Sequence, residues 1–151
     1  MRVNIALLTV TDTRTLKTDK SGKILVEKIG KAKHNLVVRK ICIDSKKEIK
    51  KILKDWTKKK NIDVIITTGG TGLTGRDITP EALDDIADKH IPGFGEVFRT
   101  VSLQTVGTSS IQSRASAILA NGKYIFSLPG SSGGVTAVSY THLTLPTILL
   151  V

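Results

Sequence analysis

The sequence contains one cysteine, few aromatic side chains and no long hydrophobic run. Cys42 is the only cysteine among 151 residues, and Phe, Trp and Tyr together make up 4%. A single cysteine excludes an intramolecular disulfide and any metal site built from several cysteines. The first apolar run, residues 3–10, has no signal peptide before it, and no segment approaches the roughly 20 apolar residues that cross a bilayer. These absences predict a cytoplasmic protein with no membrane partner.

The positive charge is concentrated in the first part of the chain. The formal net charge is +10, and residues 1–61 contain 18 Lys and Arg against 6 Asp and Glu. These lysines alternate with apolar residues at helical spacing, and the sequence has few aromatic side chains on which bases could stack. We therefore interpret them as solvated helix faces and expect no nucleic-acid partner. A positive field of this kind also favours encounter with phosphorylated small molecules.

Strand-like and helix-like segments alternate along the chain and predict one α/β domain. Short β-branched runs bounded by turn residues predict strands at 3–9, 35–43, 62–66 and 123–127. Ser45 and Glu48 form a capping box before apolar residues at helical spacing, which predicts a helix there. Further helices are expected at 21–34, 80–89, 93–103 and 110–119. The expected architecture is a three-layer α/β/α sandwich with a mostly parallel sheet.

The most informative segment is a glycine-rich loop, residues 67–81, with the sequence TTGGTGLTGRDITPE. It follows the run 62–66, so it lies at the carboxyl end of a predicted buried strand, where open α/β sheets place ligands. Gly69, Gly70 and Gly72 let backbone N–H groups approach phosphate oxygens or a flat heterocycle closely. The loop matches neither the Walker motif nor the dinucleotide fingerprint. It is predicted as an anion-binding site, and the alternative is a tight turn whose glycines serve only its geometry.

Two aspartates are expected beside this loop. Asp77 lies within it, just before a helix that we expect to begin with Thr79 as N-cap and Pro80 as the first helical residue. Asp44 follows the second predicted strand, and taken alone it fits local turn chemistry before a helix better than a functional role. Two carboxylates at the carboxyl edge of one sheet can hold Mg²⁺ between nucleotide phosphates and position an attacking phosphate.

Several motifs together resemble the MoaB and Mog proteins of molybdenum cofactor biosynthesis. They are GGTGLT at 69–74, Asp77, TPEA at 79–82, PGFGE at 92–96, SR at 113–114 and LPGS at 128–131, and their order and spacing match over residues 3–138. The resemblance implies the molybdopterin-binding domain fold. It also implies Mg²⁺-dependent adenylyl transfer, in which the phosphate of molybdopterin attacks the α-phosphorus of ATP and pyrophosphate leaves.

The resemblance implies roles for individual residues as well. Asp44 and Asp77 are expected to be catalytic and to be transient ligands of the Mg²⁺ that accompanies ATP, with no stably bound prosthetic group. The residues implied to bind substrate are Asp12, Gly69, Gly70, Thr71, Gly72, Glu96, Ser102, Ser113, Ser127, Pro129, Gly130 and Ser131. For Glu96, Ser113 and the turn at Pro129-Gly130, a purely structural role is the alternative.

The expected partners follow from the same family. Its members assemble as threefold rings, which implies a homo-oligomer, trimer or hexamer, whose product passes to a metal-insertion protein for molybdenum or tungsten. One alternative is a non-catalytic molybdopterin-binding protein of the MoaB type, against which the presence of both Asp44 and Asp77 argues. The other is a pyridine-nucleotide hydrolase of the competence-damage type on the same fold, against which the GTGLT and FGE motifs argue.

Residues 139–151 depart from the family pattern. Where the family continues with an amphipathic helix, this chain reads SYTHLTLPTILLV. Threonine and β-branched residues are poor helix formers, and Pro146 would interrupt a helix. We expect one domain over residues 1–138, followed by an atypical tail of foreign or frame-shifted origin.

Overall fold

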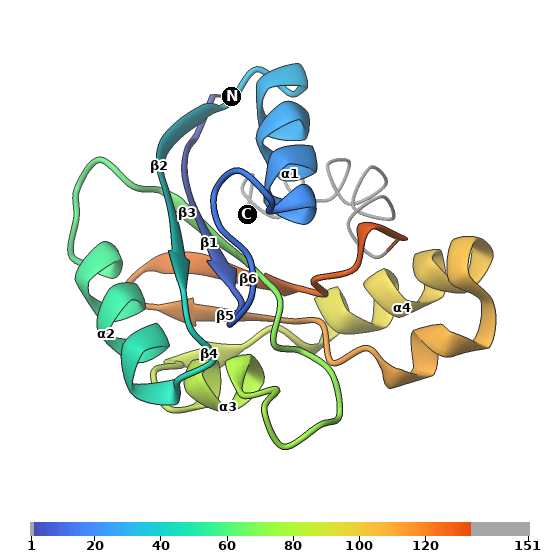
Figure 1. Ribbon diagram of the computed structural model, residues 1–151. Helices are drawn as coiled ribbons and strands as arrows, with labels where there is room; N and C mark the ends of the chain where they lie inside the picture. The colour runs from blue at the N-terminus through green and yellow to red at the C-terminus, as the bar shows by residue number, and fades with distance from the viewer. Residues whose placement is uncertain (1, 134–151) are drawn as a thin grey trace.

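A six-stranded sheet forms the centre of the molecule, with helices on both faces (Figure 1). The computed structural model describes residues 2–133, so the tail expected at 139–151 lies outside the described residues. The strands are β1 (Asn4–Val10), β2 (Asn35–Cys42), β3 (Val64–Thr68), β4 (Lys89–His90), β5 (Ser116–Ala120) and β6 (Lys123–Leu128). The helices are α1 (Lys20–Lys31), α2 (Lys46–Thr57), α3 (Thr79–Asp84), α4 (Pro92–Val106) and the 3₁₀ helix η1 (Gly107–Gln112).

The sheet is mostly parallel. Its strand order is β2-β1-β3-β6-β5-β4. β1 pairs in parallel with β2 and β3, and β3 pairs in parallel with β6, whereas β5 pairs antiparallel with both β6 and β4. The carboxyl ends of β1, β3 and β6 therefore lie side by side at one edge, which confirms the expected α/β architecture.

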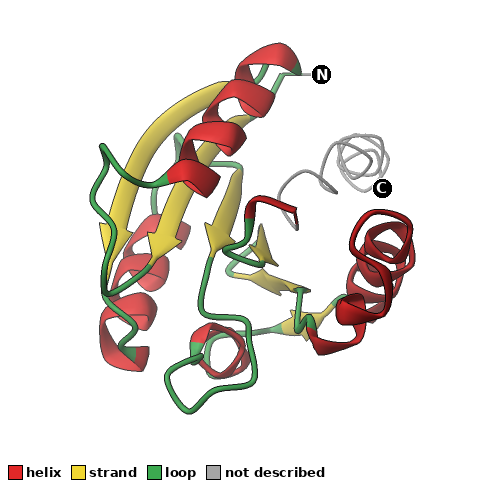
Figure 2. Cartoon of the chain, turned by 45° about the vertical axis from the view of Figure 1, so that its right-hand side comes forward, coloured by secondary structure: helices red, strands yellow, loops and turns green. Residues whose placement is uncertain are grey.

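Each face of the sheet packs against its own pair of helices, as Figure 2 shows from the side. β1 divides its side chains between them, because successive residues of a strand point to opposite faces. Ile5 and Leu7 join a core cluster that includes residues of α1 and α4. Ala6 and Leu8 join a second cluster that includes residues of α2 and α3. This two-sided burial explains why the central strands read as continuous apolar runs.

The prediction of a helix at residues 110–119 is wrong. This segment contains the end of η1 and then β5, which pairs antiparallel with β6. Asn121 and Gly122 connect the two strands with positive φ angles of 48° and 74°. An Asn-Gly pair between two apolar runs is a strong hairpin signal, because both residues tolerate this conformation. The helix-forming alanine and leucine of β5 obscured that signal, and hairpin pairing determines the structure instead.

The helix expected at 80–89 is shorter than predicted. α3 ends at Asp84, and the chain beyond it pairs with β5 as the edge strand β4. The amide of Asp88 donates to the carbonyl of Leu119 at 2.8 Å, and that of Ile91 donates to Ala117 at 2.9 Å. Thr79 is not the N-cap: it lies in the first turn of α3, and its hydroxyl donates to the carbonyl of Gly69 at 2.9 Å.

A buried carboxylate joins α1 to the first two strands. Asp19 is the N-cap of α1, accepts the amide of Gly22 at 2.9 Å, and is only 1% exposed. Its other oxygen accepts the Thr9 hydroxyl at 2.6 Å and the Arg39 guanidinium at 3.1 Å. Burial by itself would raise the pKa of Asp19, but the hydrogen bonds from Thr9, Gly22, Arg39 and Ser21 outweigh it and lower the pKa.

Within residues 2–133, no helix is long and apolar enough to cross a membrane.

Asp19→Asn is expected to lower the free energy of unfolding by about 2–3 kcal/mol at pH 7, because the charge-assisted bond to Arg39 is lost. The carboxylate's contribution is present above the unfolded pKa of about 3.9 and disappears as pH falls through the lower folded pKa. Urea unfolding from pH 7 to pH 3 should therefore show that the difference in unfolding free energy between Asp19→Asn and wild type becomes smaller in acid. The control is Asp55→Asn, since Asp55 is exposed and lies 3.8 Å from Lys59. A gap that is independent of pH would contradict this account.

Candidate active site

The candidate site lies where β1, β3 and β6 end. The glycine loop follows β3 and is held against the turn that follows β6. The amide of Gly69 donates to the carbonyl of Leu128 at 3.0 Å, and the Thr68 hydroxyl donates to the carbonyl of Pro129 at 3.0 Å. The glycine loop and the turn after β6 are therefore hydrogen-bonded neighbours.

Glycine is required at the start of the loop for two reasons. Gly69 and Gly70 have φ angles of +100° and +67°, a conformation that side chains other than glycine rarely adopt. A Cβ on Gly69 would overlap the carbonyl oxygen of Val10, and one on Gly70 would overlap the hydroxyl of Thr79. A Cβ on Gly70 would also lie 3.1 Å from a carboxylate oxygen of Asp44, so the loop backbone passes directly beside that acid.

Asp77 is fixed by its own loop. One carboxylate oxygen accepts the amide of Thr74 at 2.9 Å and its hydroxyl at 2.6 Å. A Cβ on Gly72 would lie 2.7 Å from the same oxygen. Burial acts to raise the pKa of Asp77, but hydrogen bonds from Thr74 and the Gly72 amide, together with the Arg114 charge, lower it. Asp77 is therefore held as an anion beside the backbone of the glycine loop.

Asp44 has the opposite electrostatic character. Burial raises its pKa, and the charges of Asp12 and Asp77 raise it further, against the opposing effect of Arg76. Asp12 is close enough to accept the amide of Asp44 at 2.9 Å, and it forms an ion pair with Arg76. Two predicted site residues, Asp12 and Asp77, thus disfavour ionisation of a third, Asp44, and a cation bound at Asp44 would offset that repulsion.

The carboxylates suit a magnesium ion only in combination with a ligand. Mg²⁺ prefers oxygen donors and is commonly held by one or two carboxylates together with substrate phosphates. Among the described residues, no group of three or more His, Cys, Asp or Glu is arranged to hold a metal by itself. Asp44 and Asp77 fit the shared arrangement, because both are oxygen donors beside the same loop.

One cavity of about 470 Å³, here named the loop cavity, brings most of the predicted substrate-binding residues together. Its predicted members are Gly70, Thr71, Gly72, Asp77, Ser102, Ser113, Pro129, Gly130 and Ser131. Phe98 and Val106 of α4 add an apolar wall. The Ser102 side chain is buried, and its hydroxyl has no hydrogen-bond partner among the described residues. Such a group in a cavity wall is suited to a polar ligand.

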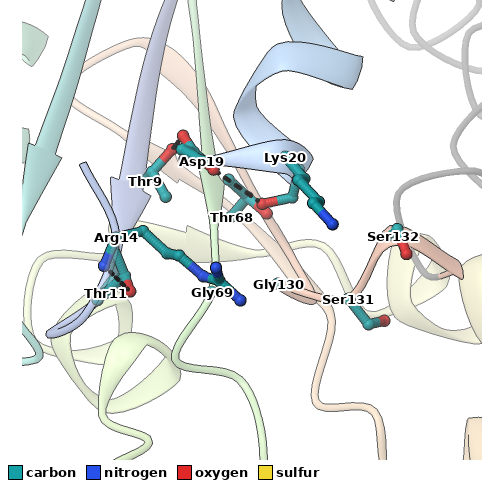
Figure 3. Close-up of a pocket in the computed structure, with 12 residues that line it drawn as sticks. Thr9, Thr11, Arg14, Asp19, Lys20, Thr68, Gly69, Gly130, Ser131 and Ser132 are labelled. Atoms are coloured by element: carbon teal, nitrogen blue, oxygen red, sulfur yellow. Dashed lines mark hydrogen bonds between the residues drawn. The ribbon is translucent and has the colours of Figure 1, made fainter. Parts of the chain in front are cut away.

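A second cavity of about 440 Å³, here named the cationic cavity, lies on the other side of Gly69 (Figure 3). Arg14 reaches it from the loop after β1, and Lys20 reaches it from the first turn of α1. Gly130 and Ser131 line both cavities, so the two are adjacent. Sequence reasoning did not assign Lys20 to the site. The sequence did contain a signal for the start of α1, because Asp19 lies three residues before Gly22, as an N-cap residue does before the amide that it accepts.

Two predicted residues lie apart from the others. Glu96 lines a separate cavity of about 480 Å³ with His90, Arg99 and Arg114. Ser127 is fully buried within β6, where its register partners are Thr67 and Ser116. Neither residue lines the loop cavity or the cationic cavity. Their roles in binding substrate remain predictions.

Cys42 is a buried strand residue, as expected. Burial, with the nearby charges of Asp44 and Glu48, raises the pKa of its thiol to about 12. A thiol with this pKa is protonated at neutral pH and is a poor nucleophile.

Comparison with known proteins agrees with the resemblance. Residues 6–148 match the family model described as "Probable molybdopterin binding domain". The chain is 42% identical over 145 residues to the molybdenum cofactor biosynthesis protein B of Bacillus cereus, covering 95% of this chain and 85% of that protein. A crystal structure of a molybdenum cofactor biosynthesis protein B is similar with a TM-score of 0.88 at 40% identity, covering 97% of this chain and 96% of that chain. The tungsten cofactor synthesizing protein MoaB from Pyrococcus furiosus is similar with a TM-score of 0.86 at 36% identity, covering 98% and 95%.

Gly70→Ala is expected to lower the free energy of unfolding by about 1–3 kcal/mol, because the alanine must keep a positive φ and its methyl group overlaps Thr79. Gly75→Ala in the same loop is the matched control, since a Cβ there meets nothing within 4 Å. Its effect should stay within about 0.5 kcal/mol. Urea unfolding of both variants measures the difference, and equal effects would argue against the tight packing of Gly70.

Proposed function

The chain belongs to the molybdopterin-binding domain family and acts in molybdenum cofactor biosynthesis, and on this premise we propose that it transfers AMP from ATP to the phosphate of molybdopterin. The observation that carries the proposal is the position of Asp44 and Asp77. Both carboxylates lie beside one glycine loop, Asp44 at Gly70 and Asp77 at Gly72. Gly70 and Asp77 line the loop cavity, which adjoins the cationic cavity at Gly130 and Ser131. A transferase needs such a point, because two substrates must meet there.

The loop cavity is suited to the pterin. It combines the apolar side chains of Phe98 and Val106 with several hydroxyl groups and the backbone of the glycine loop. A flat heterocycle with polar edges needs both kinds of contact. The buried hydroxyl of Ser102, which has no partner among the described residues, is available to one of those edges.

The cationic cavity is suited to the phosphates of ATP. Arg14 and Lys20 supply two positive charges, and Thr11 and Ser21 supply hydroxyl groups. Asp19 also lines this cavity, but its negative charge is balanced by the ion pair with Arg39. Guanidinium and ammonium groups bind phosphate oxygens through charge-assisted hydrogen bonds. A nucleotide that lies there with its α-phosphorus near Gly69 would face the loop cavity across the turn at Gly130 and Ser131.

The reaction is a displacement at phosphorus. A phosphate oxygen of molybdopterin forms a new bond to the α-phosphorus of ATP, and the bond from that phosphorus to the bridging β-phosphate oxygen breaks. Pyrophosphate leaves with the electron pair of the broken bond, so no oxidant or reductant is needed. The backbone N–H groups of the glycine loop can align the two phosphates, and positioning of this kind supplies much of the catalysis in phosphoryl transfer.

Asp44 and Asp77 are the residues that would hold Mg²⁺ in this arrangement. When bound, the ion neutralises phosphate charge and helps to align the two phosphate groups. The lowered pKa of Asp77 keeps it ionised. The raised pKa of Asp44 reflects first its burial and then the charges of Asp12 and Asp77, and a bound cation would offset both effects.

Asp44→Asn and Asp77→Asn should each reduce molybdopterin-dependent release of pyrophosphate from ATP by about 10²-fold or more, because each removes a charge from the site but little volume. The assay measures pyrophosphate with Mg²⁺ and ATP, in the presence and absence of molybdopterin. Asp84→Asn is the control, since Asp84 is an exposed acid on α3.

The outcomes separate the alternatives. Loss of release in both site variants, with normal release in the control, supports the transferase. Tight binding of molybdopterin without release by the wild type would favour a non-catalytic binding protein. Hydrolysis of pyridine nucleotides without use of molybdopterin would favour the hydrolase.

Lys20→Gln should raise the KM for ATP by about tenfold while the KM for molybdopterin stays constant, because it removes one charge-assisted contact to phosphate. Lys23→Gln, one turn further along α1, is the matched control: the Lys23 ammonium donates to the carbonyl of Lys17 and does not line the cavity. Steady-state kinetics with each substrate varied in turn measures both constants. A change confined to the KM for molybdopterin would mean that the cationic cavity binds molybdopterin and the loop cavity binds ATP.

A further inference from the structure

Arg114 makes several contacts that have no role in the function proposed above. It lies between η1 and β5, and its side chain is 30% exposed. Its Nε donates to the carbonyl of Gly72 at 2.8 Å, and its Nη2 donates to the carbonyl of Asp77 at 3.0 Å. Its Nη1 forms an ion pair with the carboxylate of Glu81 on α3. One guanidinium thus reaches both ends of the segment from Gly72 to Asp77 and the helix that follows it.

These contacts matter because the loop between them has little other support. Leu73, Thr74, Gly75 and Arg76 are all exposed. Besides those to Arg114, the contacts that this stretch makes among the described residues are those between Thr74 and Asp77 and the ion pair from Arg76 to Asp12. The bonds to Thr74 orient the carboxylate of Asp77 relative to the loop, but they do not hold the loop relative to the sheet. Arg114 does so, because it is anchored just before β5.

We propose that Arg114 is a positioning residue, which fastens both ends of the segment from Gly72 to Asp77 to the start of β5 and thereby holds Asp77 in the wall of the loop cavity. This inference rests on the proposed function for its kinetic consequence, but the fastening itself is a property of the folded chain. A misplacement of a catalytic group by about 1 Å can reduce turnover by about 10²-fold, so the fixed loop has a direct effect on rate.

The three acceptors require arginine. The planar guanidinium presents five N–H donors in a fixed fork, whereas lysine has a single ammonium group at the end of a flexible stem. The carbonyls of Gly72 and Asp77 and the carboxylate of Glu81 lie in different directions around Arg114, so one ammonium group cannot replace the fork. The second oxygen of Glu81 is buried without a hydrogen-bond partner among the described residues, which makes its dependence on Arg114 greater.

The first experiment follows cleavage of the bond after Arg76 by trypsin, since Arg76 is exposed within the fastened segment. The folded protein is digested under native conditions, and mass spectrometry of the uncleaved and cleaved chain gives the rate of cleavage at this bond. The rate is measured for wild type, Arg114→Lys, Arg114→Gln and Arg99→Lys. Arg99 is the matched control, because it donates to the carbonyls of Ser113 and Ala115, at 3.3 and 3.2 Å, without touching the loop. Cleavage should be about tenfold faster or more in both Arg114 variants and unchanged in Arg99→Lys.

The second experiment is kinetic. Arg114→Lys should lower kcat for pyrophosphate release by about 10-fold to 100-fold, with the KM for molybdopterin changed by less than about threefold. Failure of lysine to restore kcat distinguishes the fork from a simple positive charge.

The outcomes also separate this inference from the proposed function. Faster cleavage without any wild-type turnover would support the fastening and overturn the transferase. Equal cleavage rates in wild type and Arg114→Gln would overturn the fastening, whatever the turnover. Equal acceleration in the Arg99 and Arg114 variants would also overturn it, because the effect would then arise from the segment before β5 as a whole.

Discussion

The carboxyl ends of β1, β3 and β6 meet at Gly69, a residue without a side chain. The amide of Gly69 donates to Leu128 at the end of β6, and the carbonyl of Val10 at the end of β1 occupies the space of a Cβ. Gly130 packs so closely on Gly69 that a Cβ on Gly130 would lie 3.1 Å from the Cα of Gly69. Because no side chain fits between these strands, their loops all start at one place. The two cavities adjoin at Gly130, which packs on Gly69.

The charges around this contact are divided between its sides. Asp44 and Asp77 lie beside Gly70 and Gly72, and Asp12 lies next to Asp44 and is paired to Arg76. Arg14 and Lys20 line the cationic cavity, together with Asp19, whose charge is balanced by Arg39. Asp44, whose pKa is raised by burial and by the neighbouring acids, favours the arrival of a cation, and lysine and arginine favour phosphates. A metal–nucleotide complex presents both charges at once. For the proposed complex of ATP with Mg²⁺, this complementarity would favour one orientation across the glycine loop.

The sequence predicted the parts of the fold that depend on local pattern. The four long strands, the helix after Ser45 and the glycine loop follow from apolar spacing and turn residues, and the structure confirms them. The hairpin at Asn121-Gly122 was missed because its flanking residues also favour a helix. The end of α3 was missed because the pairing of β4 with β5 decides it, and that pairing joins residues about 30 positions apart in sequence.

The candidate site divides in the same way. The resemblance identified Asp44, Asp77 and the glycines, which the structure brings to one edge of the sheet. Arg114 was seen only as part of a motif, because its contacts to Gly72, Asp77 and Glu81 require the folded chain. The most direct test of the account follows phosphorus from ATP labelled at the α-position, incubated with Mg²⁺, molybdopterin and the wild-type protein. The account predicts that the label is recovered in a molybdopterin adduct together with unlabelled pyrophosphate. Recovery of the label only in ATP, AMP or ADP, with molybdopterin unchanged, would contradict it.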